Sequence, residues 1–186
     1  MQASFYDLFQ SFCSCNWKAT LTRKVDFVKC DPHEDWVYTD ELDSMLIGLL
    51  KKVGIRSATA VIKSWSNTWA SSSRLHEDRR LSCVFGCGAE DTLDHYLCCD
   101  PLWTAVISNS FLRLELLWSR PMKRLGLIDP SIESLQMLAI AFSCYHSIKF
   151  THLDEVLQML ESGNPYQVHT RLMHYACAHF KDIVGS

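Results

Sequence analysis

The chain lacks both a long apolar run and a strong net charge. Its 186 residues are 48% hydrophobic, 11% aromatic and 21% charged, with a formal net charge of -3. The longest uncharged apolar stretch, Ser134 to Ile148, is interrupted by Gln136 and His146 and falls short of the roughly 20 residues that span a bilayer. We therefore expect no membrane partner, one compact domain, and no global field that attracts nucleic acid.

A secretory signal is missing too, because Met1 to Cys15 has neither a basic start nor an uninterrupted apolar stretch. We therefore expect an intracellular protein of the cytoplasm or nucleus, with its 9 cysteines reduced. Clustered cysteines in such a compartment usually bind metal, whereas isolated ones are small buried apolar residues. Cys13, Cys15 and Cys30 form no clear half-site with His33, and we expect them to be buried.

Apolar residues recur at helical spacing along most of the chain, which predicts a mostly α fold with one small irregular element in the middle. We divide the chain into an ambiguous segment at 1–39, a helical pair at 40–82, a knuckle at 83–103 and C-terminal helices at 104–186. No tandem repeat or low-complexity tract interrupts this order.

The helical pair is placed by its caps. Asp40 is expected to cap the first helix, which Gly54 closes. Ser57 is expected to cap the second helix, whose apolar face carries Trp65 and Trp69. Both tryptophans are therefore predicted to lie in the core.

Similar signals place the C-terminal helices, the first of which is expected from Pro101 to Leu117. The start signals of three further helices are Asp129 with Pro130, Thr151 with Asp154, and Asn164 with Pro165. The first of these three helices carries an apolar stripe that reaches about Phe150.

The irregular element contains Cys83, Cys87, His95 and Cys99 in a Cys-x3-Cys-x7-His-x3-Cys spacing. Structural zinc takes four such ligands on a tetrahedron, and a closed shell leaves no position for a catalytic water. We therefore predict one structural Zn²⁺ rather than a catalytic ion. Cys98 is an alternative fourth ligand, which spacing alone does not exclude.

Local sequence explains how the two halves of this site form. Gly86 and Gly88 permit the positive φ values that bring the two cysteines of the first half together. Asp91 is expected to cap a short helix on which His95 and Cys99 share one face.

Four parts of the chain together resemble a known region. They are the stretch Trp65-Ser-Asn-Thr-Trp69, the segment Arg74-Leu-His-Glu, the cluster from Cys83 to Cys99 and the following Pro101-Leu-Trp103. The region that they resemble is the zinc-binding region that follows the polymerase in non-LTR retrotransposon polyproteins. The resemblance implies Cys99 as the fourth ligand, and a C-terminal module that assists RNA or DNA handling in target-primed reverse transcription. It also implies the polymerase part of the same polyprotein as a partner. The chain departs from many relatives in the three-residue gap between Cys83 and Cys87.

Catalytic constellations are absent from the sequence. A reverse transcriptase needs an adjacent Asp pair for its metal ions, and the chain has none. A zinc deaminase needs His-x-Glu before Pro-Cys-x-x-Cys, which is also missing. No residues are suited to a metal-dependent endonuclease. We expect no enzyme activity, and interpret the chain as a detached piece of a larger polyprotein or a degraded remnant.

Charge is distributed unevenly along the chain. From Cys83 to Trp103 there is no Lys or Arg, whereas Ser44 to Leu75 has no acidic residue. The second stretch predicts nucleic-acid contacts at Lys51, Lys52, Arg56, Lys63 and Arg74. Further candidates are Arg79, Arg80, Arg120, Lys123 and Arg124. The alternatives are a solvated helix face and, for the chain as a whole, a protein interaction module that docks onto the polymerase.

Overall fold

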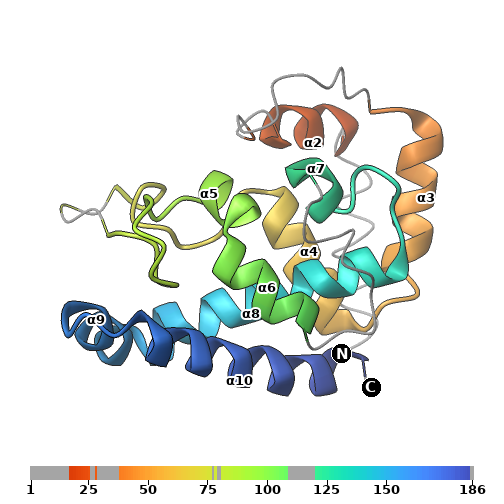
Figure 1. The fold of residues 1–186 in the computed structure, drawn as a ribbon. Coiled ribbons are helices and arrows are strands. Elements are labelled where there is room, and N and C mark those ends of the chain that lie inside the picture. Colours follow the sequence, from red (N-terminus) through yellow and green to blue (C-terminus); the bar gives the residue numbers. More distant parts are fainter. Residues whose placement is uncertain are drawn as a thin grey trace.

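The computed structural model describes residues 17–25, 28, 38–76, 78, 81–108 and 120–184. Its helices are α2 (Trp17–Val25), α3 (Asp40–Leu50), α4 (Ile55–Trp65), α5 (Leu93–Cys98), α6 (Asp100–Ser108), α7 (Pro121–Arg124), α8 (Ile132–Thr151), α9 (Leu153–Glu161) and α10 (Pro165–Val184). Over these ranges the only β pairing is an isolated antiparallel bridge between Ser82 and Glu90. The predicted mostly α fold with a small irregular element is confirmed (Figure 1).

Helix α8 is the centre of the described fold. It contacts α3, α4, α6, α7, α9 and α10, and α10 runs along one side of the molecule (Figure 1). The middle of α8 is buried on all sides, since the consecutive residues from Met137 to Ala141 are all buried. An apolar stretch of this kind has to be covered by other helices, which explains its central position.

The starts of α3 and α4 differ from the predicted caps. The Thr39 hydroxyl accepts the Leu42 N–H at 3.2 Å, so Asp40 is the first helical residue and not the cap. Gly54 begins α4 rather than closing α3, because it is the extended residue before Ile55. Ser57 lies inside α4 and is buried, so the cap predicted there is wrong.

Both tryptophans of the helical pair lie in the core, as predicted. Trp65 is 0% exposed and its indole N–H donates to the Leu125 carbonyl at 2.8 Å. Trp69 is buried as well, and donates to the Ser64 hydroxyl at 2.9 Å. It lies beyond the end of α4, so the chain has already left the helix when Trp69 enters the core.

The C-terminal helices confirm one of the predicted starts and correct two. The Asn164 side chain accepts the Gln167 N–H at 3.4 Å at the start of α10. Ser131 and not Asp129 caps α8, through a reciprocal pair with Ser134. Asp129 instead adopts a left-handed φ of 48°.

Thr151 and Asp154 form no capping box. Thr151 is the last residue of α8, and His152 precedes α9 without a side-chain cap. The helix expected from Pro101 to Leu117 is described as α6, and its last part lies outside the described residues, as do Cys13, Cys15 and Cys30. No described helix is both long enough and apolar enough to cross a bilayer.

Gly126 marks a close approach between the turn after α7 and the start of α8. Its φ is 68°, and an added Cβ would lie 2.7 Å from Leu135 Cδ2. We expect Gly126→Ala to lower the free energy of unfolding by about 1–3 kcal/mol, measured by denaturant titration. Gly48→Ala in α3 is the control, since its Cβ would meet nothing within 4 Å and a helical Ala should be neutral or stabilising. An equal loss in both variants would contradict this role for Gly126.

Candidate metal centre

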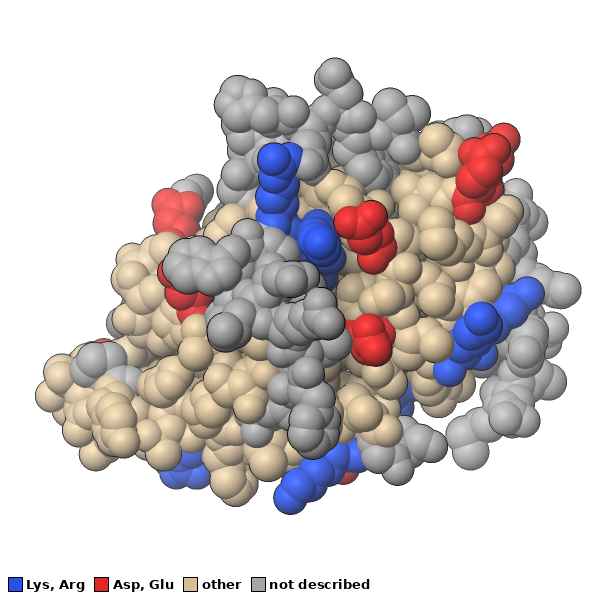
Figure 2. Space-filling view, turned by 45° about the vertical axis from the view of Figure 1, so that its right-hand side comes forward, with Lys and Arg blue, Asp and Glu red and all other residues tan. Residues whose placement is uncertain are grey.

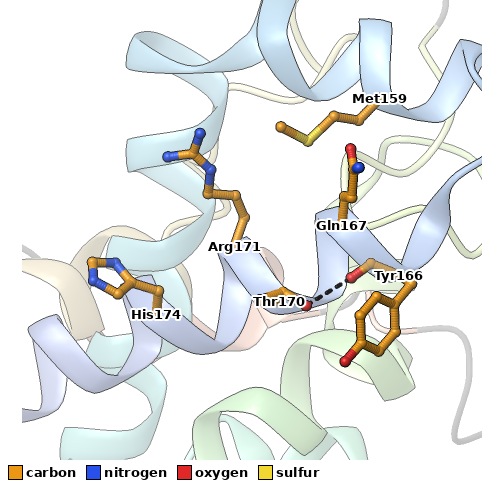
Figure 3. Close-up of a pocket in the computed structure, with 6 residues that line it drawn as sticks. All are labelled: Met159, Tyr166, Gln167, Thr170, Arg171 and His174. Carbon is orange, nitrogen blue, oxygen red and sulfur yellow. Dashed lines mark hydrogen bonds between the residues drawn. The ribbon is translucent and has the colours of Figure 1, made fainter.

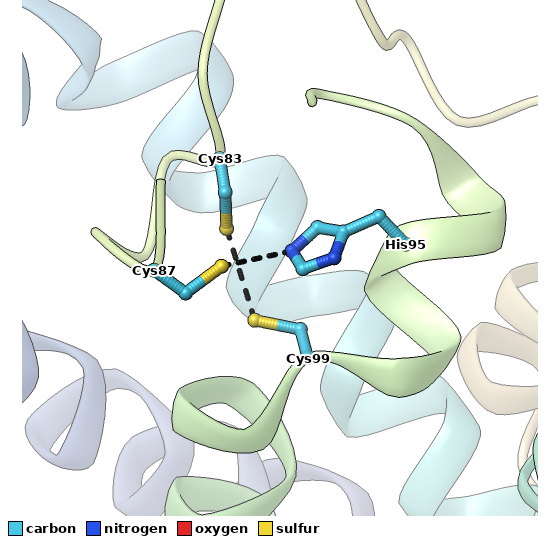
Figure 4. Close-up of side chains that lie close together, drawn as sticks. All are labelled: Cys83, Cys87, His95 and Cys99. Atoms are coloured by element: carbon cyan, nitrogen blue, oxygen red, sulfur yellow. Dashed lines mark hydrogen bonds between the residues drawn. The ribbon is translucent and has the colours of Figure 1, made fainter. Parts of the chain in front are cut away.

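Four side chains of the knuckle point toward one another: Cys83, Cys87, His95 and Cys99 (Figure 4). Their ligand atoms all lie within 4.8 Å of one another. Cys83 Sγ and Cys99 Sγ are 3.7 Å apart, and Cys87 Sγ is 3.0 Å from His95 Nε2. The cluster could therefore hold one metal ion.

The distances can be compared with those of a tetrahedral zinc site. With sulfur at ~2.3 Å and nitrogen at ~2.0 Å from the ion, two sulfurs lie about 3.8 Å apart and sulfur and nitrogen about 3.5 Å apart. The pair of Cys83 and Cys99 already fits this geometry. The pair of Cys87 and His95 has to open by about half an ångström. A disulfide needs ~2.05 Å between its two sulfurs. The three thiols of the cluster and the neighbouring Cys98 are all free, so none of them forms a disulfide.

The first half-site is a tight turn, as its glycines predicted. Gly86 has a φ of 83° and Gly88 a φ of 80°. Cys83 donates its backbone N–H to the Ala89 carbonyl at 2.7 Å, which closes the loop across the turn. The Phe85 N–H points at Cys83 Sγ at 3.4 Å, so the backbone supports one sulfur directly. The three-residue gap between the two cysteines therefore permits their convergence.

The second half-site is the short helix α5 and the residue after it. Thr92 caps the helix, because its hydroxyl accepts the His95 N–H at 3.1 Å. Cys99 follows the last helical residue in an extended conformation, and this turn brings its sulfur to the cluster. Cys98, still within the helix, is not a member of the group. The structure thus unites Cys99 with the other three residues.

Asp91 is not the cap that the sequence suggested, because its carboxylate is buried in the interior. It is 1% exposed and accepts the Ser72 N–H at 2.7 Å and the Tyr96 hydroxyl at 2.6 Å. Lys149 of α8 reaches the same carboxylate at 3.2 Å, and the Tyr145 hydroxyl lies at 3.4 Å. A buried charge is tolerated only when it is paired and hydrogen-bonded, which this network achieves.

This network connects the Cys/His cluster to the helical body. Tyr96 follows His95 in the chain, and its hydroxyl also accepts the Val84 N–H beside Cys83 at 3.4 Å. The Tyr96 ring stacks on Trp69, with ring centroids 5.7 Å apart. Burial, followed by the Asp91 charge, raises the pKa of Tyr96, so the phenol stays protonated and donates. Both half-sites are therefore held against a common anchor.

The cluster is buried on one side and open on the other. Cys83 and Cys99 are buried, whereas Cys87 is exposed and His95 is half-buried. The hydrogen bond between Cys83 and Cys99 lowers the pKa of Cys83, and that bond and burial raise the pKa of Cys99. The cluster is therefore open to solvent on the Cys87 side.

The predicted basic residues fall into two groups. Lys51, Lys52, Arg56 and Lys63 are exposed on or beside α3 and α4. Arg74 is exposed too, but it lines a hollow of about 520 Å³ together with the acidic Glu90 and Asp94 of the knuckle. Figure 2 shows Lys and Arg in separate groups on the face displayed rather than in one continuous patch.

Of the further basic candidates, Arg120 is exposed, whereas Arg124 and Lys123 contact other groups of the chain. Arg124 is buried, donates to the Leu97 carbonyl at 2.6 Å and lies over the Trp103 ring. Lys123 lies 3.6 Å from Asp129. Arg79 and Arg80 lie outside the described residues.

A second hollow of about 490 Å³ lies beside α9 and α10 (Figure 3). Its residues are Met159, Tyr166, Gln167, Thr170, Arg171 and His174. Arg171 is ion-paired with Glu155, and the Thr170 hydroxyl donates to the Tyr166 carbonyl at 3.0 Å. Among the described residues, the knuckle is the one group of Cys, His and acidic side chains arranged for a metal.

Comparison with known proteins adds no relative to this picture. No protein-family model matches the chain, and neither does any curated protein or solved structure.

Proposed function

We propose that the chain is a noncatalytic module in which one structural zinc ion fastens the knuckle to a helical body. In the family that its motifs resemble, such a module belongs to a non-LTR retrotransposon polyprotein. There it would help to hold RNA or DNA during target-primed reverse transcription. The convergence of Cys83, Cys87, His95 and Cys99 within 4.8 Å is the observation that carries the proposal.

The donor set favours zinc among the available metals. Three thiols and one imidazole match the closed Cys₃His shell of structural zinc sites, whereas Mg²⁺ and Ca²⁺ prefer oxygen ligands. Four protein ligands leave no open position for a reacting water, so the ion would stabilise the fold. Zn²⁺ with three thiolates carries a formal charge of about -1, which would repel phosphate from the knuckle itself.

We therefore propose that nucleic acid contacts the basic residues in α4 and in the turn between α3 and α4. The exposed residues Lys51, Lys52, Arg56 and Lys63 lie in a stretch with no acidic residue between Ser44 and Leu75. Cations that face solvent without nearby acids can exchange their counterions for phosphates.

Salt dependence tests this assignment. If four cations contact a single strand, we expect a slope of log affinity against log salt near -2.8, which is about a 50-fold loss of affinity between about 50 and 200 mM salt. The double variant Lys51→Gln/Lys52→Gln should reduce the slope by about 1.4, measured by fluorescence anisotropy with labelled RNA. Lys181→Gln, on exposed α10, is the control and should leave it unchanged. Undetectable binding of RNA and DNA at low salt would contradict the nucleic-acid assignment.

A protein interaction module is the second candidate, supported by the acidic surface of the knuckle. Glu90 and Asp100 are exposed, and no Lys or Arg lies between Cys83 and Trp103. Such a surface suits a basic partner such as a nucleic-acid-binding polymerase. A chain that binds zinc and the polymerase part but no nucleic acid would favour this candidate.

A further inference from the structure

Helix α8 exposes a row of aromatic rings that its role as the central helix does not require. Phe142, His146 and Phe150 follow one another at four-residue intervals and therefore lie on one face of the helix. The Phe142 and His146 rings are 5.7 Å apart, and those of His146 and Phe150 4.5 Å apart. Phe150 is 61% exposed. We call these three residues the ring row.

The inner end of the ring row is fixed in the core. Phe142 packs edge-on against the buried Trp69, with ring centroids 5.7 Å apart. Burial, with a contribution from the nearby Lys63 charge, lowers the pKa of His146, so its ring is neutral at pH 7. The row therefore presents preorganised flat surfaces from a rigid helix.

Positive charge lies beside the inner end of the ring row. Lys63 Nζ lies 5.6 Å from the centre of the Phe142 ring. Arg56 is exposed seven residues earlier in α4, on the same helix face as Lys63. Helix α4 has no acidic residue, and α8 has none after Glu133. A purely apolar row would suit a protein partner, whereas rings beside cations match the bases and phosphates of a nucleic acid.

We propose that the ring row is a stacking platform for unpaired bases of a single-stranded nucleic acid, with Lys63 and Arg56 holding the adjacent phosphates. The inference rests on the proposed nucleic-acid function and specifies its surface and its ligand. Single strands are required because bases inside a duplex offer no free face, and aromatic stacking accepts any base sequence.

Nucleic-acid binding measurements on the variant Phe150→Ala distinguish base stacking from charge attraction. The probes are a labelled thymidine strand of about 12 nucleotides and an abasic strand of equal length, which keeps the phosphates and lacks the bases. We expect Phe150→Ala to weaken thymidine-strand binding about 5-fold or more and to leave abasic-strand binding unchanged. Phe150→Trp should retain the affinity. Tyr166→Ala, which removes an aromatic ring 77% exposed on α10, is the matched control and should bind both strands like wild type.

Three results would overturn the platform, and only the first of them leaves the proposed nucleic-acid function standing. If wild type and Phe150→Ala bind the thymidine strand equally and with a steep salt dependence, nucleic-acid binding stands and the platform falls. If wild type binds neither strand at low salt, both proposals fail. Self-association of wild type that Phe150→Ala abolishes, without nucleic-acid binding, would assign the ring row to a protein contact instead.

Discussion

Replacing Asp91 with alanine is expected to lower the free energy of unfolding by about 3–5 kcal/mol, because the change removes the carboxylate that balances the buried Lys149 ammonium. Lys149 is only 8% exposed. The Ser72 N–H and the Tyr96 hydroxyl would lose their acceptor as well. Urea denaturation of the metal-loaded protein, followed by circular dichroism, measures the loss.

The double variant Asp91→Ala/Lys149→Met tests whether the buried ammonium of Lys149 causes this loss. Removing both charges should recover part of the stability, because neither of the two side chains then has to be desolvated as an ion on folding. Glu161→Ala, an exposed acid at the end of α9, is the control and should change stability by less than about 0.5 kcal/mol. A loss below about 1 kcal/mol for Asp91→Ala would show that the buried network does not anchor the knuckle.

Replacing the buried ligand Cys83 with serine is expected to abolish metal binding and to unfold the knuckle. The binding free energy of structural zinc is folding free energy, with apparent values of about 10–16 kcal/mol in small zinc modules. We therefore expect the melting temperature of Cys83→Ser to match that of wild type treated with a chelator. Calorimetry with and without chelator measures both.

Cys98→Ser is the matched control for the ligand variant. Cys98 neighbours Cys99 in the chain but lies outside the cluster, so the variant should keep its metal and its chelator-sensitive melting temperature. If Cys98→Ser loses metal and Cys99→Ser keeps it, the assignment of the fourth ligand is wrong. If the chelator lowers the melting temperature of no variant, the cluster holds no structural metal.

Sequence spacing was informative where the interactions are local. Three correctly predicted features depend only on residues a few positions apart. They are the turn at Gly86 and Gly88, the convergence of the first two cysteines of the knuckle, and the start of α10 at Asn164. The same local rules misplaced caps where several candidates compete within one turn. Thr39 rather than Asp40 caps α3, because the residue that faces the free N–H groups is fixed by the path of the incoming chain.

Long-range contacts could not be predicted from spacing. Asp91 looked like a helix cap, but its partner Lys149 is 58 residues away, and only the packing of α8 against the knuckle brings the two together. The exposure of Phe150 also depends on how distant parts of the chain pack around α8. In the sequence it ends an apolar stripe, whereas in the fold the other sides of α8 are covered by six helices and this ring remains at the surface.

The metal content of the wild-type chain decides whether the four-residue cluster holds a structural zinc ion. Native mass spectrometry of protein purified without added metal should show a single species carrying one Zn²⁺ ion, and Cys87→Ser should lack it. A folded wild-type chain that carries no metal, and whose mass does not change when Zn²⁺ is supplied, would contradict the account.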